Sequence, residues 1–237
     1  MTQPVRYVLQ DRVAVISIDD GKANALSPAV LTGLAEALDW AESNANAVVI
    51  AGRKGRFCAG FDLKLMTSGP KAAGELVKSG AELLMRLYEH PQPVVIACTG
   101  HAMAGGAVML LCADVRIGAS GDFKIGLNEV AIGMPMPVFV SELARERLER
   151  RALVLATLGA SIVDPATAAE IGFLDRVVDE EEVRDAAFAE AARLAKLPKA
   201  AYASTKRSIR SPVIAHIRAT FEDDLARVIQ DFGIKTG

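Results

Sequence analysis

Cysteine and histidine are scarce in this sequence, with three residues of each among 237. Cys58, Cys98 and Cys112 lie among apolar neighbours, which favours buried, reduced thiols over a disulfide framework and predicts an intracellular protein. No CxxC or HExxH spacing occurs, so no metal site is expected. The N-terminus also lacks the pattern of a secretory signal, so we expect a cytoplasmic location.

Charge of one sign is not in excess either, because 27 Lys and Arg stand against 29 Asp and Glu, a formal net charge of −2. No basic stripe typical of nucleic-acid binding is present, so no nucleic-acid partner is expected. The uncharged run 91–113 is long enough to raise the question of a membrane span. Two prolines at its start and Gly100, Gly105 and Gly106 within it indicate instead a strand, a turn and a buried helix, and no membrane partner is expected.

Sequence motifs that bind phosphates are also missing. Neither GxxxxGK[ST] nor a strand-linked GxGxxG occurs, which excludes the usual nucleotide and dinucleotide cradles. The nearest approach to the hydrolase motif GxSxG, at 118–122, fails at its last position and is better interpreted as a turn between strands.

The patterns that are present predict an α/β fold. Alternating apolar residues at 13–19 predict a half-buried strand paired with 6–9, and Ser27 followed by Pro28 predicts a helix start. Further strands are expected at 47–51, 94–100, 114–119 and 122–126, with glycine turns and helices between them, in repeated strand-strand-helix units. The chain becomes helical after Asp179, and we expect Pro198 and Pro212 to break this tail into about three helices.

The chain is expected to form one fold with a soft boundary near Leu194. Residues 1–194 then form the mixed core, and residues 195–237 form a helical C-terminal region. The Ala-rich amphipathic tail is consistent with packing between subunits.

Two glycine turns lead from a predicted strand into a helix, at 59–62 and 104–107. The first N–H groups of a helix have no intrahelical partner, and the helix dipole adds positive charge there. Two such ends that converge would form an oxyanion hole for a carbonyl oxygen that gains negative charge. The alternative is that the glycines only allow close packing of strand and helix, and spacing alone does not separate the two.

Glu129 is the candidate general base, because it is a lone carboxylate in the apolar segment 123–137. Apolar surroundings raise the pKa of a carboxyl group toward neutral pH, where proton transfer is efficient. The alternative is an ordinary helix-cap or surface glutamate at a turn. The pair Asp19 and Asp20 precedes Gly21 and indicates a turn, not two catalytic acids.

Taken in order, five segments resemble the crotonase (enoyl-CoA hydratase/isomerase) superfamily. They are DDGKANALS (19–27), GRFCAGFDLKLM (55–66), ACTGHAMAGGAVMLLCADVRIG (97–118), FKIGLNEVAIGMPMP (123–137) and GASIVDPATAAEIGFLDRVVDE (159–180). The resemblance implies a spiral of ββα units with a helical C-terminal region, 195–237, that builds homotrimers or hexamers. It also implies an acyl-CoA thioester as substrate, with coenzyme A as part of the substrate and no separate cofactor.

The resemblance assigns roles to particular residues. It implies that the backbone N–H groups of Phe61 and Gly105 form the oxyanion hole and that Glu129 exchanges protons. The turn that contacts the coenzyme A moiety and the segment beside it correspond to Lys22, Ala59, Phe61, Asp62, Leu63, Lys64 and Gly105. The basic turn with Arg53, Lys54 and Arg56 is either a solvated loop or an attraction for the phosphates of coenzyme A.

One departure from the family pattern guides the functional hypothesis. Hydratases of the family resemble one another in two glutamates, and here Val108 occupies the first of these positions while Glu129 occupies the second. One carboxylate suffices for a 1,3-proton shift, so the leading hypothesis is a Δ3,Δ2-enoyl-CoA isomerase of fatty-acid metabolism. A hydratase or another crotonase-type enzyme is the first alternative, with His101 or the region of Glu142 as the second group. A non-catalytic acyl-CoA binding protein is the other alternative.

Overall fold

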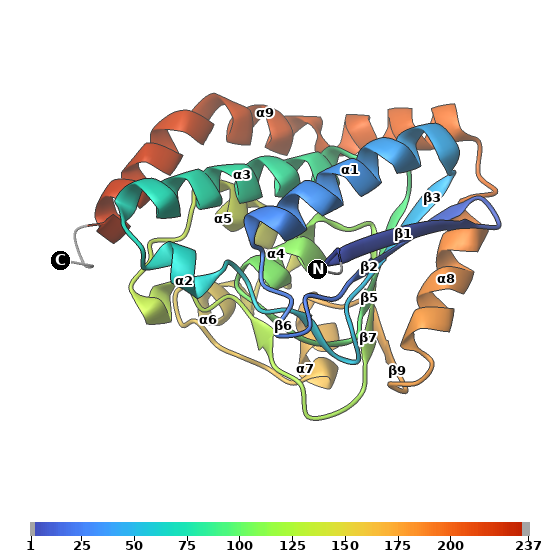
Figure 1. The fold of residues 1–237 in the computed structure, drawn as a ribbon, viewed down its shortest axis with the longest axis horizontal. Coiled ribbons are helices and arrows are strands. Elements are labelled where there is room, and N and C mark those ends of the chain that lie inside the picture. The colour runs from blue at the N-terminus through green and yellow to red at the C-terminus, as the bar shows by residue number, and fades with distance from the viewer. Residues whose placement is uncertain (1–2, 234–237) are drawn as a thin grey trace.

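The structure, a computed structural model, describes residues 3–233. Its larger sheet has six strands, with helices against both faces (Figure 1). These are β1 (Val5–Gln10), β2 (Val13–Ile18), β3 (Ala47–Ala51), β5 (Val94–Cys98), β7 (Val115–Ala119) and β9 (Arg176–Val178), and they lie in that order across the sheet. The hairpin of β1 and β2 is antiparallel, and all other neighbours are parallel. The predicted pairing of 6–9 with 13–19 is therefore confirmed.

A second sheet is formed by the short parallel strands β4 (Gly55–Cys58), β6 (Gly100–Met103) and β8 (Ile125–Gly126). Each follows directly after a strand of the larger sheet, so the chain repeats a strand in one sheet, a strand in the other and then helical structure. This confirms the expected spiral of ββα units. It also corrects two predictions: the strand expected at 94–100 ends at Cys98 before β6 begins, and the strand expected at 122–126 is reduced to two residues.

Gly100 allows β6 to pair closely with β4 in the second sheet. A Cβ at Gly100 would lie 2.1 Å from the backbone carbon of Gly55, so only glycine lets the two chain segments approach this closely. The short strands have no apolar period of their own, which is why the sequence pattern does not reveal them.

Helical segments join and cover the two sheets. They are α1 (Pro28–Asn44), α2 (Leu63–Met66), α3 (Pro70–Glu89), α4 (Gly105–Cys112), the 3-10 helix η1 (Val130–Ile132), α5 (Val138–Arg147), α6 (Leu153–Thr157), α7 (Pro165–Ile171), α8 (Val183–Leu194) and α9 (Lys199–Gly233). The Ser27 side chain accepts from the Val30 N–H and Pro28 opens α1, which confirms the predicted helix start. No helix within residues 3–233 is both long and apolar enough to cross a membrane.

Alternate residues of the larger sheet belong to two separate hydrophobic cores. Ile16, Ile50 and Ile96 face one core together with α1, α3, α4 and α5. Val49 and Val95 face the other, which α8 covers. Both faces of the sheet are therefore buried, as expected for parallel strands.

The C-terminal tail forms two helices, α8 and α9, so the prediction that Pro212 breaks it a second time is wrong. Pro212 lies inside α9 and cannot donate to the carbonyl of Ser208. The hydroxyl of Ser211 donates to that carbonyl instead, at 3.2 Å, so the missing hydrogen bond is replaced. Pro198 does separate the two helices, as expected.

Helix α9 lies along α3 in Figure 1 and also packs against α5. Its residues Ile217, Leu225 and Val228 are buried in the same core as the larger sheet. The boundary predicted near Leu194 coincides with the end of α8. The role of 195–237 in oligomerisation stays a prediction.

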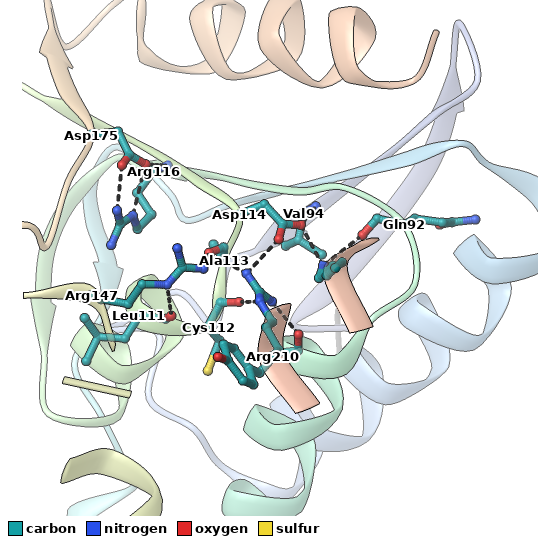
Figure 2. Close-up of polar contacts among 12 residues, drawn as sticks. Gln92, Val94, Leu111, Cys112, Ala113, Asp114, Arg116, Arg147, Asp175 and Arg210 are labelled. Atoms are coloured by element: carbon teal, nitrogen blue, oxygen red, sulfur yellow. Dashed lines mark hydrogen bonds and ion pairs between the residues drawn. The ribbon is translucent and has the colours of Figure 1, made fainter. Parts of the chain in front are cut away.

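A buried cluster of charged residues holds the carboxyl end of α4 (Figure 2). Arg147 donates to the carbonyl oxygens of Leu111 and Ala113 at 3.2 and 2.5 Å, and Arg210 donates to that of Cys112 at 3.4 Å. Cations at the carboxyl end of a helix interact favourably with the helix dipole, and their N–H groups donate hydrogen bonds to the last carbonyl oxygens.

Asp114 holds the cationic side chains of this cluster in place. Its carboxylate accepts from Lys206 at 2.6 Å, from Arg210 at 2.7 Å and from the Val94 N–H at 2.8 Å. Lys206 and Arg210 are 8% and 6% exposed. If the Asp114 carboxylate were removed, bulk water could not solvate these two cations in its place. The two ion pairs join α9 to the short connection between α4 and β7, where Asp114 lies.

We expect Asp114→Asn to lower the free energy of unfolding by about 3 kcal/mol, because two buried cations lose their shared anion. Urea denaturation measures the change. Asp39→Asn is the control, since Asp39 pairs with Arg86 at 2.5 Å but is 71% exposed, and should cost less than about 1 kcal/mol. Equal losses in the two variants would show that the cluster does not stabilise the fold in this way.

Candidate active site

A cavity of about 360 Å³ lies beside the two predicted glycine turns. Its walls come from the turn before α2, from α3, α4 and α5, and from the segment around η1. The lining is mostly apolar and consists of Ala59, Phe61, Leu63, Met66, Thr67, Val77, Leu84, Ala104, Gly105, Val108, Asn128, Glu129, Ile132, Met134, Pro137, Phe139 and Val140. All three residues predicted to act in catalysis (Phe61, Gly105 and Glu129) therefore line one cavity.

The two glycine turns meet at this cavity with their backbones in contact. A Cβ on Gly60 would lie 3.3 Å from the nitrogen of Gly105, and a Cβ on Gly105 would lie 3.5 Å from the Cα of Gly60. Gly60 also has φ +88°, a conformation that favours glycine. The glycines thus do allow close packing, and the same packing brings the two turns together.

The N–H groups of Phe61 and Gly105 are available to a ligand. Gly105 is the first residue of α4, so its N–H has no partner within the helix. Within the described part of the chain, neither N–H donates to a protein acceptor. The turns themselves are fixed, because Leu26 N donates to Gly60 O at 2.8 Å and Ala104 N donates to Gly126 O at 3.0 Å. Two fixed, unpaired donors on one cavity are what an oxyanion hole requires.

Ala104 carries local backbone strain at this point. Its φ of +47° and ψ of −121° are unusual for a residue with a side chain. Such a conformation costs on the order of 1–3 kcal/mol and persists when the surrounding structure imposes it. Here it turns the chain from β6 into α4 and so sets the direction of the Gly105 N–H. The sequence gives no sign of this strain.

Gly80 is a further site residue that the sequence analysis missed. It lies in the middle of α3, where glycine is unfavourable by about 1 kcal/mol relative to alanine. A Cβ at Gly80 would lie 2.1 Å from Cε1 and 2.5 Å from Cζ of Phe61. The Phe61 ring therefore packs directly against the backbone of α3 at Gly80, and Phe61 itself lines the cavity.

Glu129 is 5% exposed and immediately precedes η1. Its Oε2 atom has no hydrogen-bond partner among residues 3–233. Burial raises the pKa of Glu129 from its usual 4.5 to about 7. Its backbone is fixed, because Met134 N donates to its carbonyl oxygen at 2.9 Å. The carboxyl group can therefore gain or lose a proton near neutral pH, as predicted for a general base.

Asn128 places a second polar group beside Glu129. Its Oδ1 is buried and likewise unpaired in the described structure. Buried polar atoms without partners are rare, and two in one cavity indicate a place for a polar ligand or water.

The two groups considered as a second catalytic residue, His101 and Glu142, do not line this cavity. Val108 does line it, so the position of the missing carboxylate is apolar. His101 accepts from the Lys124 N–H through Nδ1 at 2.9 Å and packs edge-on against Phe123. Glu142 pairs with Arg145 at 3.5 Å. Neither His101 nor Glu142 belongs to the described lining, so neither is placed as a second catalytic group.

Residues predicted to contact coenzyme A divide into two groups. Ala59 and Leu63 line the cavity, and Leu63 is 72% exposed at its open side. Asp62, Lys64 and Lys22 lie outside the lining. The Asp62 carboxylate caps α2 by accepting from the Lys64 N–H at 2.9 Å. Lys64 is exposed, as is Lys22.

The loop that carries Lys22 is fixed by Asn24, which is fully buried and has φ +54°. Its amide donates to the carbonyl oxygens of Ile18 and Phe57 at 2.9 and 3.2 Å. Asp20 accepts from the Asn24 N–H at 2.9 Å. This loop is therefore held against the strand that precedes the first glycine turn.

The basic turn makes contacts of its own. Arg53 Nε donates to the Lys22 carbonyl at 2.8 Å, and Lys54 pairs with Glu181. No group of three His, Cys, Asp or Glu side chains that could hold a metal ion occurs in the described range.

We expect the burial of Glu129 to oppose folding at high pH. Because its pKa is raised in the folded protein, the folded state binds more protons than the unfolded state between about pH 4.5 and 7, and stability falls as pH rises through this window. Glu129→Gln has no titrating carboxyl group at this position, so its stability does not fall for this reason as pH rises. The free energy of unfolding of the variant relative to the wild type should therefore increase by about 2–3 kcal/mol from pH 5 to pH 8.

Urea denaturation at several pH values measures this difference. Glu149→Gln, at an exposed position, is the control for replacing a glutamate. If the Glu129→Gln and wild-type stability curves ran parallel from pH 5 to 8, burial would not be raising the pKa of Glu129.

Comparisons with known proteins identify the family of this chain. The chain matches the family described as enoyl-CoA hydratase/isomerase over residues 9–231. A solved structure of an enoyl-CoA hydratase/isomerase family protein from Pseudomonas syringae is 44% identical, with a TM-score of 0.92, and the match covers 95% of this chain and 98% of that one.

Two curated relatives differ in the reaction that their names state. The human mitochondrial enoyl-CoA delta isomerase 1 is 29% identical over 92% of this chain and 74% of its own length. A probable enoyl-CoA hydratase from Bacillus subtilis is 33% identical over 78% of this chain and 73% of its own length. The chain therefore belongs to the enoyl-CoA hydratase/isomerase family and is an acyl-CoA enzyme with the crotonase fold.

Proposed function

We propose that this enzyme isomerises 3-enoyl-CoA to 2-enoyl-CoA, with Glu129 as the single proton shuttle. The observation that carries the proposal is the content of the cavity. Among the described lining residues only Glu129 is ionisable, and it shares the cavity with the unpaired N–H groups of Phe61 and Gly105. The resemblance to an enoyl-CoA delta isomerase supports the same reaction.

The reaction takes two proton transfers and no co-reactant. The thioester oxygen accepts hydrogen bonds from the Phe61 and Gly105 N–H groups. The Glu129 carboxylate removes a proton from C2, the electron pair of that C–H bond forms a C1=C2 double bond, and the negative charge moves to the thioester oxygen. Glu129 then returns the proton to C4, and the electrons shift to form the C2=C3 bond of the product.

The apolar cavity favours these steps. Burial brings the pKa of Glu129 to about 7. This reduces the difference between the pKa of Glu129 and the higher pKa of the substrate C2–H group, which favours proton transfer. Two N–H donors in such a site stabilise the dienolate, and removal of one such donor has cost about 3–4 kcal/mol in other enzymes.

The open side of the cavity is the proposed entrance for coenzyme A. Ala59 and Leu63 line this side, and the positive charges of Lys22 and Lys64 suit the phosphates. Asp62 contributes by capping α2 and so fixing the turn that carries Phe61. No separate cofactor is needed.

Hydration of 2-enoyl-CoA is the second candidate reaction. The unpaired Oδ1 of Asn128 beside the unpaired Oε2 of Glu129 favours it, because the two atoms can hold a water molecule. An amide orients water but exchanges no proton, and Val108 supplies none, so Glu129 would have to deprotonate the water and protonate C2 in turn.

We also expect the enzyme to form homotrimers or hexamers, with 195–237 as the oligomerisation region. The family resemblance is the ground for this expectation.

We expect purified enzyme to convert 3-hexenoyl-CoA to the conjugated 2-enoyl thioester, followed by ultraviolet absorbance and chromatography. Glu129→Gln should lose at least about a thousandfold in kcat, because the amide carries no transferable proton. The wild-type rate should rise with pH through about 7 and then level off, since the carboxylate form is the base.

Val108→Ala is the matched control, because it changes the same cavity without touching a proton-carrying group. Full activity in Glu129→Gln would overturn the proposed shuttle. Loss of the conjugated absorbance on incubation with 2-hexenoyl-CoA, with formation of a 3-hydroxyacyl-CoA, would identify hydration as the reaction instead.

We expect Gly80→Ala to reduce kcat at least about tenfold while leaving KM and stability nearly unchanged. The added Cβ displaces the Phe61 ring and with it the N–H that acts in the transition state, whereas alanine favours the helix itself. Ser79→Ala, at an exposed position of the same helix, is the control. Wild-type kcat in Gly80→Ala would show that the ring contact does not position the donor.

A further inference from the structure

The cavity has an open side and a closed end. Leu63 and Ile132, which line its open side, are 72% and 51% exposed. Leu84 and Val140 are each 2% exposed and line its buried end, together with Phe139 at 4%. The polar coenzyme A requires the open side, so an acyl chain that leaves the thioester in the other direction meets only the buried apolar end.

A separate void lies behind this closed end. It measures about 10 Å³, close to the smallest space that holds one water molecule. Eight apolar residues line it: Leu26, Leu34, Leu38, Ile50, Leu83, Leu84, Leu87 and Met109. With no polar group in the lining, the void is unsuited to water but suited to hydrocarbon.

Leu84 is the one residue, among those described, that lines both spaces. Its position in α3 explains this. Val77, seven residues before it, lies on the same stripe of the helix and lines the cavity. Leu87, three residues after it, lines only the void. Leu84 therefore belongs to the wall that the cavity and the void share.

We propose that Leu84 closes the acyl pocket and sets the longest acyl chain that the enzyme accepts. This inference rests on the proposed function, in which the thioester lies at Phe61 and Gly105 and the chain passes Glu129. Shortening Leu84 to alanine removes three carbon atoms and joins the void to the cavity, which gives room for about two further methylene groups. The enzyme should then accept a longer substrate.

The experiment compares Leu84→Ala with Leu87→Ala. Both residues are 2% exposed, lie on the same helix and line the same void, so both variants enlarge the core, but only the first opens it to the cavity. We would measure kcat/KM for 3-hexenoyl-, 3-octenoyl-, 3-decenoyl- and 3-dodecenoyl-CoA. In wild type kcat/KM should fall beyond one chain length. In Leu84→Ala, kcat/KM for the substrate two carbons longer than the wild-type limit should rise about tenfold relative to wild type. In Leu87→Ala, kcat/KM for that substrate should not change.

Binding of saturated acyl-CoA thioesters of the same lengths, measured by calorimetry, separates the two proposals. If the longest tightly bound chain is greater in Leu84→Ala than in Leu87→Ala but no isomerisation occurs, the proposed reaction fails and the role of Leu84 stands. If isomerisation occurs but both variants keep the wild-type length limit, the role of Leu84 is overturned. A wild type without any length limit would overturn it as well, since the chain would then leave along Ile132 into solvent.

A milder pair of variants covers the case in which the alanine variants fail to fold. Leu84→Val and Leu87→Val remove less volume at the same two positions. The same difference between them, in the same direction, is expected, and identical length limits would again overturn the role of Leu84.

Discussion

Helix α4 is held at its carboxyl end and left open at its amino end, and the candidate site depends on this asymmetry. All of its residues are buried, so the carbonyl groups at its carboxyl end need partners within the protein. Arg147 and Arg210 satisfy its last carbonyl groups with positive charge, and Asp114 in turn fixes Arg210. At the amino end Gly105 lines the cavity, and its N–H has no acceptor in the described structure. The buried charges therefore orient a helix whose free end faces the proposed substrate.

Glu129 combines two opposing physical demands. Its burial raises the pKa to about 7, which suits a group that must both take and return a proton. The same burial makes its anion unfavourable in the folded protein, so the group is retained at a loss of stability. Asn128 and Glu129 both keep an unpaired oxygen in the described structure. Such a site favours folding less than an apolar one would, because two buried polar atoms lack hydrogen-bond partners within the described protein.

The sequence predicts those parts of the fold that local patterns determine. Ser27 and Pro28 start a helix, and the two glycine turns follow from neighbouring residues. For Glu129 the neighbouring residues left two interpretations open, a general base in apolar surroundings and a surface glutamate at a turn, and the structure shows it buried. The parts that were missed depend on residues distant in the chain. The Gly80 contact with the Phe61 ring and the shared wall to which Leu84 belongs exist only once α3 has packed. The three-stranded sheet was not predicted because strands of two to four residues are too short to show a period in their hydrophobic pattern.

The central claim is that one buried carboxylate carries the same proton from C2 to C4. The most direct test uses a 3-enoyl-CoA labelled with deuterium at C2, converted in ordinary water under single-turnover conditions and analysed by mass spectrometry and NMR. Because Glu129 is only 5% exposed, a substantial part of the abstracted deuterium should appear at C4 of the product. A product without deuterium at C4, with the label released to water, would contradict a proton shuttle by a single buried carboxylate.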